Sequence, residues 1–191
     1  MIRTFVAVDV NPETRAALSR DLATLRNAFP GVKWSNPDNL HLTLKFLGDV
    51  RESDLDELFS ALDEAVSGFE PFVIEVGGVG AFPHWRAPRI VWAGCRDGAD
   101  EAARLGLAVD KACADLGYEP ERRTFQPHLT LGRVKFPADA SGLRVAVDAL
   151  GDCDYGFIDV DAICVYMSEL RRAGPVYSPM YTVELQGRKN G

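Results

Sequence analysis

The sequence predicts an α+β fold made of two similar lobes, each with an antiparallel sheet lining a central cleft and with helices outside. The first observation is that the tetrapeptide HLTL occurs twice, beginning at His41 and at His128. The second is that similar strands and helices are expected in a similar order around each copy, which indicates an internal duplication. The third is that the 191 residues, 47% of them hydrophobic, contain no linker-like segment. We therefore expect residues 1–191 to form a single bilobal domain with an approximate two-fold axis.

The first half of the chain is expected to alternate strands and helices. Asn11 and Pro12 are a favourable N-cap and first residue for a helix that continues until Pro30 stops it. Ser53 is expected to cap a second helix, whose apolar stripe ends at Gly68. Apolar residues with strand-like spacing, many of them β-branched or aromatic, predict strands at residues 2–9, 32–34, 41–47, 72–76 and 89–93.

The second half is expected to repeat this alternation. A loop rich in glycine and proline, residues 77–88, joins the last two strands of the first half. A third amphipathic helix is expected over residues 99–116, and a weaker one over residues 138–150 is interrupted at Gly142. The tail from residue 187 is expected to be frayed. The remaining strands are predicted at residues 128–134, 157–167 and 177–185, the last two around a Gly-Pro turn.

The charge balance restricts the partners that the protein can bind. There are 21 Lys and Arg against 28 Asp and Glu, a net charge of −7. This balance argues against wrapping a long polyanion, because affinity for duplex nucleic acid comes largely from neutralised phosphates. The charge balance does not argue against binding the end of one nucleic-acid strand. No apolar run approaches the ~18 residues of a membrane span, and the N-terminus lacks the pattern of a signal peptide, so no membrane partner is expected.

The cysteines are expected to be reduced structural thiols in a cytoplasmic protein. They are Cys95, Cys113, Cys153 and Cys164, and none falls in a CxxC pair. With three histidines in the whole chain, no zinc-ligand spacing occurs, so neither a metal nor another cofactor is expected. We also expect the protein to be a monomer.

The two HLTL segments carry the candidate catalytic residues. Side chains alternate along a strand, so His41 and Thr43 share one face while the two leucines enter the core. His128 and Thr130 are arranged in the same way in the second copy. Across an approximate two-fold axis, two imidazoles and two hydroxyls would flank one bound anion.

This arrangement suits in-line displacement at phosphorus. One histidine removes a proton from the attacking oxygen while the other protonates the leaving oxygen, and each step is typically worth ~10²–10⁴-fold in rate. Hydroxyls and a nearby cation can hold the phosphoryl oxygens, so the chemistry needs no metal. The symmetry leaves open which histidine is the acid.

Three further residues are candidates for substrate binding. Phe46 and Arg133 each lie five residues after a candidate histidine. Simple alternation puts both on the core face, so contact with substrate would require a bulge or a strand end near Gly48 and Gly132. Phe46 could equally be a core residue. Lys45 shares the His41 face by alternation and is a candidate phosphate contact. His84 has no counterpart in the duplicated motif and is expected to have no role in the site. Arg89 is expected to be structural or solvated.

Several segments resemble the 2H phosphoesterase superfamily, and most closely its RNA 2′,3′-cyclic phosphodiesterase branch, also called the 2′-5′ RNA ligase family. The resemblance covers nearly the whole chain. It implies metal-free hydrolysis of RNA 2′,3′-cyclic phosphate ends to 2′-phosphomonoesters, with His41 as proton donor and His128 as proton acceptor. RNA 3′ ends or small cyclic nucleotides would be the substrates. The matching segments are RTFVAVDV, KWSNPDNLHLTLKFLG, GAFPHWRAPRIVWAG, FQPHLTLGRV and GPVYSPMYTVEL.

Three other functions remain as alternatives. The same residues could join RNA ends through a 2′-5′ linkage, although hydrolysis should dominate in water. A binding module for nucleotides or RNA ends could keep the cleft without catalysis, but both histidines and both threonines are intact. A metal hydrolase lacks a His/Asp/Glu cluster at ligand spacing.

Overall fold

The computed structural model describes residues 1–172 and 174–187, and within them it confirms the α+β class. No helix in these residues is long and apolar enough to cross a membrane. The strands are β1 Ile2–Asp9, β2 Lys33–Trp34, β3 His41–Val50, β4 Phe72–Phe82, β5 Ile90–Cys95, β6 His128–Arg133, β7 Asp154–Val160, β8 Ala162–Arg171 and β9 Gly174–Glu184. The helices are α1 Pro12–Ala28, α2 Leu55–Val66, α3 Ala99–Asp115 and α4 Leu143–Asp148.

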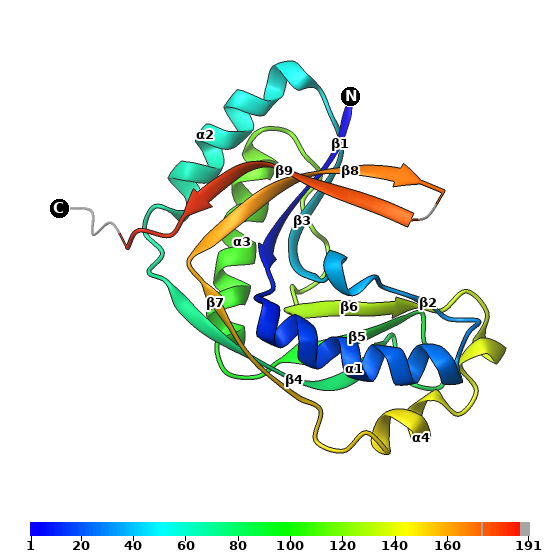
Figure 1. Cartoon of the computed structure of the whole chain (residues 1–191). Helices are drawn as coiled ribbons and strands as arrows, with labels where there is room; N and C mark the ends of the chain where they lie inside the picture. Colours follow the sequence, from blue (N-terminus) through cyan, green and yellow to red (C-terminus); the bar gives the residue numbers. More distant parts are fainter. Residues whose placement is uncertain (173, 188–191) are drawn as a thin grey trace.

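The strands of the described residues form one curled antiparallel sheet in the order β7-β4-β5-β6-β3-β1-β8-β9, with β2 added beside β6 (Figure 1). This order is symmetric about the boundary between β6 and β3, which confirms the expected duplication. We call β3, β1, β8 and β9 the first lobe and β6, β5, β4 and β7 the second lobe. The two expected sheets are therefore halves of one sheet, joined where Leu42 pairs with Leu129.

The two halves of the chain exchange strands between the lobes. β4 follows α2, yet it pairs with β5 and β7 in the second lobe. β8 follows β7 of the second lobe, yet it pairs with β1 and β9 in the first lobe. β7 and β8 lie almost end to end along the path from one lobe to the other (Figure 1). Each lobe is thus built from both halves of the chain.

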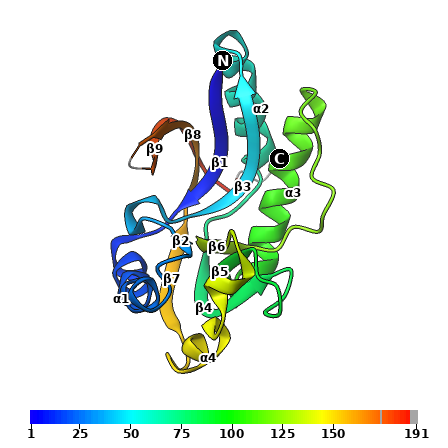
Figure 2. The same cartoon turned by 90° about the vertical axis from the view of Figure 1, so that its right-hand side faces the viewer.

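The main core lies between the sheet and helices α1, α2 and α3. Helices α2 and α3 lie side by side (Figure 2). α1 begins as expected, because the Asn11 side chain accepts a hydrogen bond from the Thr14 amide and Pro12 is the first helical residue. Burying one leucine or valine side chain in this core stabilises the fold by roughly 1.5–3 kcal/mol. Core residues include Leu18, Leu22, Leu58, Leu62, Leu105 and Val109 from the helices and Leu42 and Leu129 from the sheet.

The structure differs from the sequence expectations at three places. The loop expected at residues 77–88 is partly strand, and its Gly80 serves close packing: a Cβ there would lie 2.1 Å from the Trp92 ring. The strand expected at residues 157–167 is two strands, since β7 pairs with β4 and β8 with β1. Ser53 does not cap α2; its hydroxyl donates to Asp54 within a 3₁₀ turn. Residues 173 and 188–191, which include part of the expected turn and tail, lie outside the described residues.

Candidate active site

The two candidate histidines begin β3 and β6, and each strand carries a bulge three residues after its histidine. In β3, Leu44 is extra between the pairs Thr43–Ala7 and Lys45–Val6. In β6, Leu131 occupies the same place, between residues paired with Trp92 and Val91. A bulge reverses the alternation of side chains beyond it. The duplicated bulge therefore changes which later residues share a face with each histidine.

The pairing of β3 with β6 brings the two His-Thr pairs together on one face of the sheet. Because these antiparallel strands are in register at Leu42 and Leu129, the residues before and after each leucine lie opposite one another. Since both leucines point into the core, their neighbours face the opposite side. We call this side the site face; it carries His41, Thr43, His128 and Thr130.

Each imidazole is held by a backbone carbonyl two residues earlier. His41 Nδ1 lies 2.8 Å from the carbonyl oxygen of Asn39, and His128 Nδ1 lies 2.6 Å from that of Gln126. A carbonyl only accepts, so Nδ1 must carry the proton in both rings. The neutral form of each ring then leaves Nε2 unprotonated, and this nitrogen is available for proton transfer.

The surroundings of the two histidines differ in charge. Burial lowers the pKa of both, and their backbone hydrogen bonds raise it. The positive charge of Arg133 also lowers the pKa of both rings, so Arg133 acts electrostatically on both halves of the site. The negative charge of Asp9 raises the pKa of His41 alone.

Aromatic rings flank each histidine, and sequence reasoning did not find them. In the first lobe, the ring centroids of Phe5 and Tyr177 lie 4.8 Å and 5.4 Å from that of His41. In the second lobe, the ring centroid of Phe82 lies 5.1 Å from that of His128, edge to face. Alternation along β1 could have placed Phe5 on the site face. Tyr177 and Phe82 had no local signal, because they come from strands distant in the sequence.

The bulges place Phe46 and Arg133 at equivalent positions beyond the two histidines. Phe46 is 50% exposed, so it is not a core residue. The Arg3 guanidinium lies 4.7 Å from the centroid of its ring, a cation–π contact. Arg133 is also exposed, and it pairs in register with Ile90 as Phe46 does with Phe5. The bulge in β6 lies at Leu131, next to Gly132 as expected, whereas the bulge in β3 lies at Leu44, four residues before Gly48.

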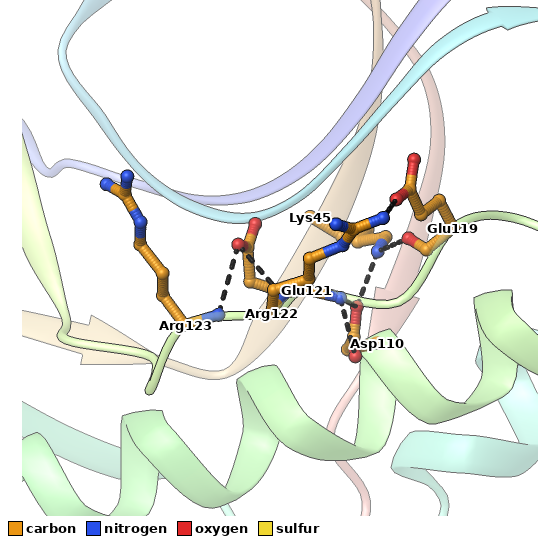
Figure 3. A network of polar contacts seen from close by, with 6 residues as sticks. All are labelled: Lys45, Asp110, Glu119, Glu121, Arg122 and Arg123. Atoms are coloured by element: carbon orange, nitrogen blue, oxygen red, sulfur yellow. Dashed lines mark hydrogen bonds and ion pairs between the residues drawn. The ribbon is translucent and has the colours of Figure 1, made fainter.

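Lys45 does not lie on the site face, and the expected phosphate contact is wrong. The bulge turns Lys45 towards α3, where it is 6% exposed (Figure 3). Its ammonium donates to the Asp110 carboxylate and to the Glu119 carbonyl. Asp110 in turn accepts from the amide of Glu121. Lys45 therefore secures the segment between α3 and β6 rather than binding an anion.

The remaining candidates lie outside the histidine cluster. His84 is exposed in the turn between β4 and β5. Arg89 is exposed, and its guanidinium donates to the Lys135 carbonyl, consistent with a structural role. In the described residues, Cys95, Cys113, Cys153 and Cys164 are free thiols, and no group of three His, Cys, Asp or Glu side chains could hold a metal ion.

The chain is similar to known proteins over nearly its whole length. The family model described as LigT like Phosphoesterase matches residues 8–92 and 94–177, one segment for each half of the chain. A Methanothermobacter thermautotrophicus protein named RNA 2′,3′-cyclic phosphodiesterase is 37% identical over 96% of this chain and 99% of its own length. A Thermotoga maritima protein of the same name is 33% identical over 97% of each chain.

Solved structures show the same fold. TT0787 of Thermus thermophilus superposes with a TM-score of 0.82 at 30% identity, covering 98% of this chain and 100% of that one. Escherichia coli LigT complexed with 3′-AMP superposes with a TM-score of 0.73 at 25% identity, covering 96% of this chain and 98% of that one.

Proposed function

Because this chain belongs to the LigT-like phosphoesterase family, we propose that it hydrolyses RNA 2′,3′-cyclic phosphodiester ends to 2′-phosphomonoesters. One observation carries the proposal: two His-Thr pairs share one face of the sheet, and each ring is fixed through Nδ1 so that Nε2 can exchange a proton. We further propose that residues 1–191 act as one bilobal unit, since each lobe supplies one of the pairs.

In the proposed reaction, the cyclic phosphate lies between the two histidines. His128 Nε2 accepts a proton from water while the water oxygen bonds to phosphorus. The bond from phosphorus to the 3′ oxygen breaks, and protonated His41 donates its Nε2 proton to that oxygen. The 2′ phosphomonoester remains, and a proton passes from His128 to His41 through solvent to restore the starting state. No step requires a metal ion.

The threonines and Arg133 are proposed to hold the phosphate. The hydroxyls of Thr43 and Thr130 can donate to its non-bridging oxygens, and the Arg133 guanidinium can offset the negative charge that develops there. Phe46 is proposed to stack on the terminal base, because it is half exposed beyond the His41 pair. The name of the curated relatives and the 3′-AMP held by Escherichia coli LigT support a nucleotide phosphate as ligand.

The test is hydrolysis of an oligoribonucleotide with a 2′,3′-cyclic phosphate end, in excess chelator, with the product isomer identified. His41→Ala and His128→Ala should each lower kcat by roughly 10²–10⁴-fold. His84→Ala is the matched control, because this exposed histidine lies outside the cluster, and it should retain full activity. Wild-type binding without turnover, or full turnover in either cluster variant, would refute the mechanism.

The same assay separates the alternatives. Loss of turnover on chelation would point to a metal hydrolase. Adding RNA with a 5′-hydroxyl end would detect 2′-5′ joining, which should remain a minor product because water is the more abundant nucleophile.

A further inference from the structure

The two lobes differ at the residue directly opposite each histidine. In the first lobe, Asp9 of β1 pairs in register with His41. In the second lobe, Gly94 of β5 pairs in register with His128. The positions are equivalent, because Ala7 and Trp92 each pair with the threonine that follows. His41 therefore lies opposite a carboxylate, whereas His128 lies opposite a glycine.

The strands beside β1 and β5, which are β8 and β4, differ between the lobes in a related way. Tyr166 of β8 lies opposite Phe5, and its hydroxyl donates a hydrogen bond to Asp9 Oδ1. The equivalent residue of the second lobe is Phe82 of β4, which lies opposite Ile90 and has no hydroxyl. Burial and the bond to Asp9 raise the pKa of Tyr166, so this hydroxyl stays protonated and keeps donating. The first lobe thus has both a carboxylate and the group that orients it.

Close packing explains why the second lobe has no carboxylate here. A Cβ at Gly94 would lie 3.0 Å from the Gly77 carbonyl oxygen and 3.1 Å from the Trp92 ring. A side chain at this position would therefore displace the ring that flanks His128. The asymmetry is consequently built into the packing of β4 against β5.

The charged and titratable groups that surround His41 include side chains from three strands. Asp9 on β1 is negative, Arg133 on β6 is positive, and Tyr177 on β9 is a neutral phenol whose pKa burial raises. His128, also on β6, is the second histidine of the site. Arg133 lowers the pKa of both histidines, so the sign of its effect does not distinguish them. Asp9, by contrast, raises the pKa of His41.

We propose that Asp9, oriented by Tyr166, is a positioning residue that selects His41 as the protonated histidine and leaves His128 neutral. A carboxylate opposite His41 stabilises an imidazolium there, whereas the charge that acts on His128 is that of Arg133, which is positive and disfavours an imidazolium. This inference rests on the proposed function for its catalytic meaning. It resolves the acid/base order that the duplicated motif leaves open.

The first test follows the proton directly and needs no turnover. The ring Cε1–H signals of His41 and His128 would be titrated by NMR in the wild type, Asp9→Asn and Asp159→Asn. The last variant is a matched control, because it removes the same charge from an exposed acid lining the same small cavity as Asp9. Asp9→Asn should lower the measured pKa of His41 and leave that of His128 unchanged. Equal shifts in both rings, no shift, or the same shift in the control would overturn the proposal.

Tyr166→Phe keeps the test decisive if Asp9→Asn fails to fold. This variant should lower the pKa of His41 by a smaller amount than Asp9→Asn does, since the carboxylate remains but loses the hydrogen bond that orients it. Asp9→Glu, which keeps the negative charge, should give a His41 pKa between those of Asp9→Asn and the wild type. An unchanged His41 titration in Tyr166→Phe would refute the anchoring role.

Kinetics then tests the catalytic meaning. Asp9→Asn should lower kcat/KM at pH 7.5 by roughly three- to tenfold, with the activity optimum displaced to lower pH. A uniform loss at every pH would indicate a merely structural effect and contradict the proposal. If the wild type does not hydrolyse the cyclic phosphate, the proposed function fails, while the NMR titration still decides the role of Asp9.

Discussion

Replacing Lys45 with methionine should destabilise the protein without weakening substrate binding. The Lys45 ammonium is 6% exposed and donates to Asp110 and to the Glu119 carbonyl. Removing one partner of a fully buried pair costs about 3–5 kcal/mol. Asp110 is 18% exposed and keeps the Glu121 amide as a donor, so the expected loss is smaller, about 2–3 kcal/mol. For a chain of this length the loss corresponds to a fall in Tm of roughly 5–10 °C.

The assay combines urea unfolding with steady-state kinetics well below Tm. Lys111→Met is the matched control, because this lysine is 78% exposed and pairs with Asp115 on the same helix, and such exposed pairs contribute little to stability. KM for the cyclic phosphate should stay within about twofold of wild type in both variants. A tenfold rise in KM for Lys45→Met with unchanged stability would refute the structural role and restore Lys45 as a phosphate ligand.

Three further predictions concern pH, packing and thiol reactivity. Burial holds the folded pKa of His41 and His128 below the unfolded value of about 6.5, so the unfolded chain binds more protons. The free energy of unfolding should therefore fall as pH drops from about 6.5 through the folded pKa, and a double His→Gln variant should flatten this dependence in urea titrations. Gly80→Ala should cost about 1–3 kcal/mol by displacing Trp92, measured by urea unfolding; an unchanged midpoint would contradict this. Cys95, whose pKa burial raises to about 12, should resist iodoacetamide at pH 8 until the protein unfolds, as mass spectrometry would show.

The local pattern was enough to predict most elements and the residues at the centre of the site. Asn11 and Pro12 marked the start of α1, and the HLTL repeats marked β3, β6 and the inward leucines. These features depend on neighbours within a few residues, which the sequence shows directly.

Features that depend on distant partners could not be predicted. The bulge at Leu44 follows from pairing with β1, and it moved Lys45 off the site face and Phe46 onto it. Tyr166 reaches Asp9 only because β8 crosses into the first lobe. Alternation within one strand carries no information on either event.

The exchange of strands has a consequence for the integrity of the molecule. A protease that cuts the turn between β4 and β5 at the exposed residues His84 or Arg86 would divide the chain, but β4 of the first fragment would remain between β5 and β7 of the second. β8 of the second fragment would likewise remain between β1 of the first and its own β9. The pieces are interleaved, so nicked protein should hold together until both lobes unfold. Two separately synthesised fragments should therefore reassemble into one particle carrying both histidines.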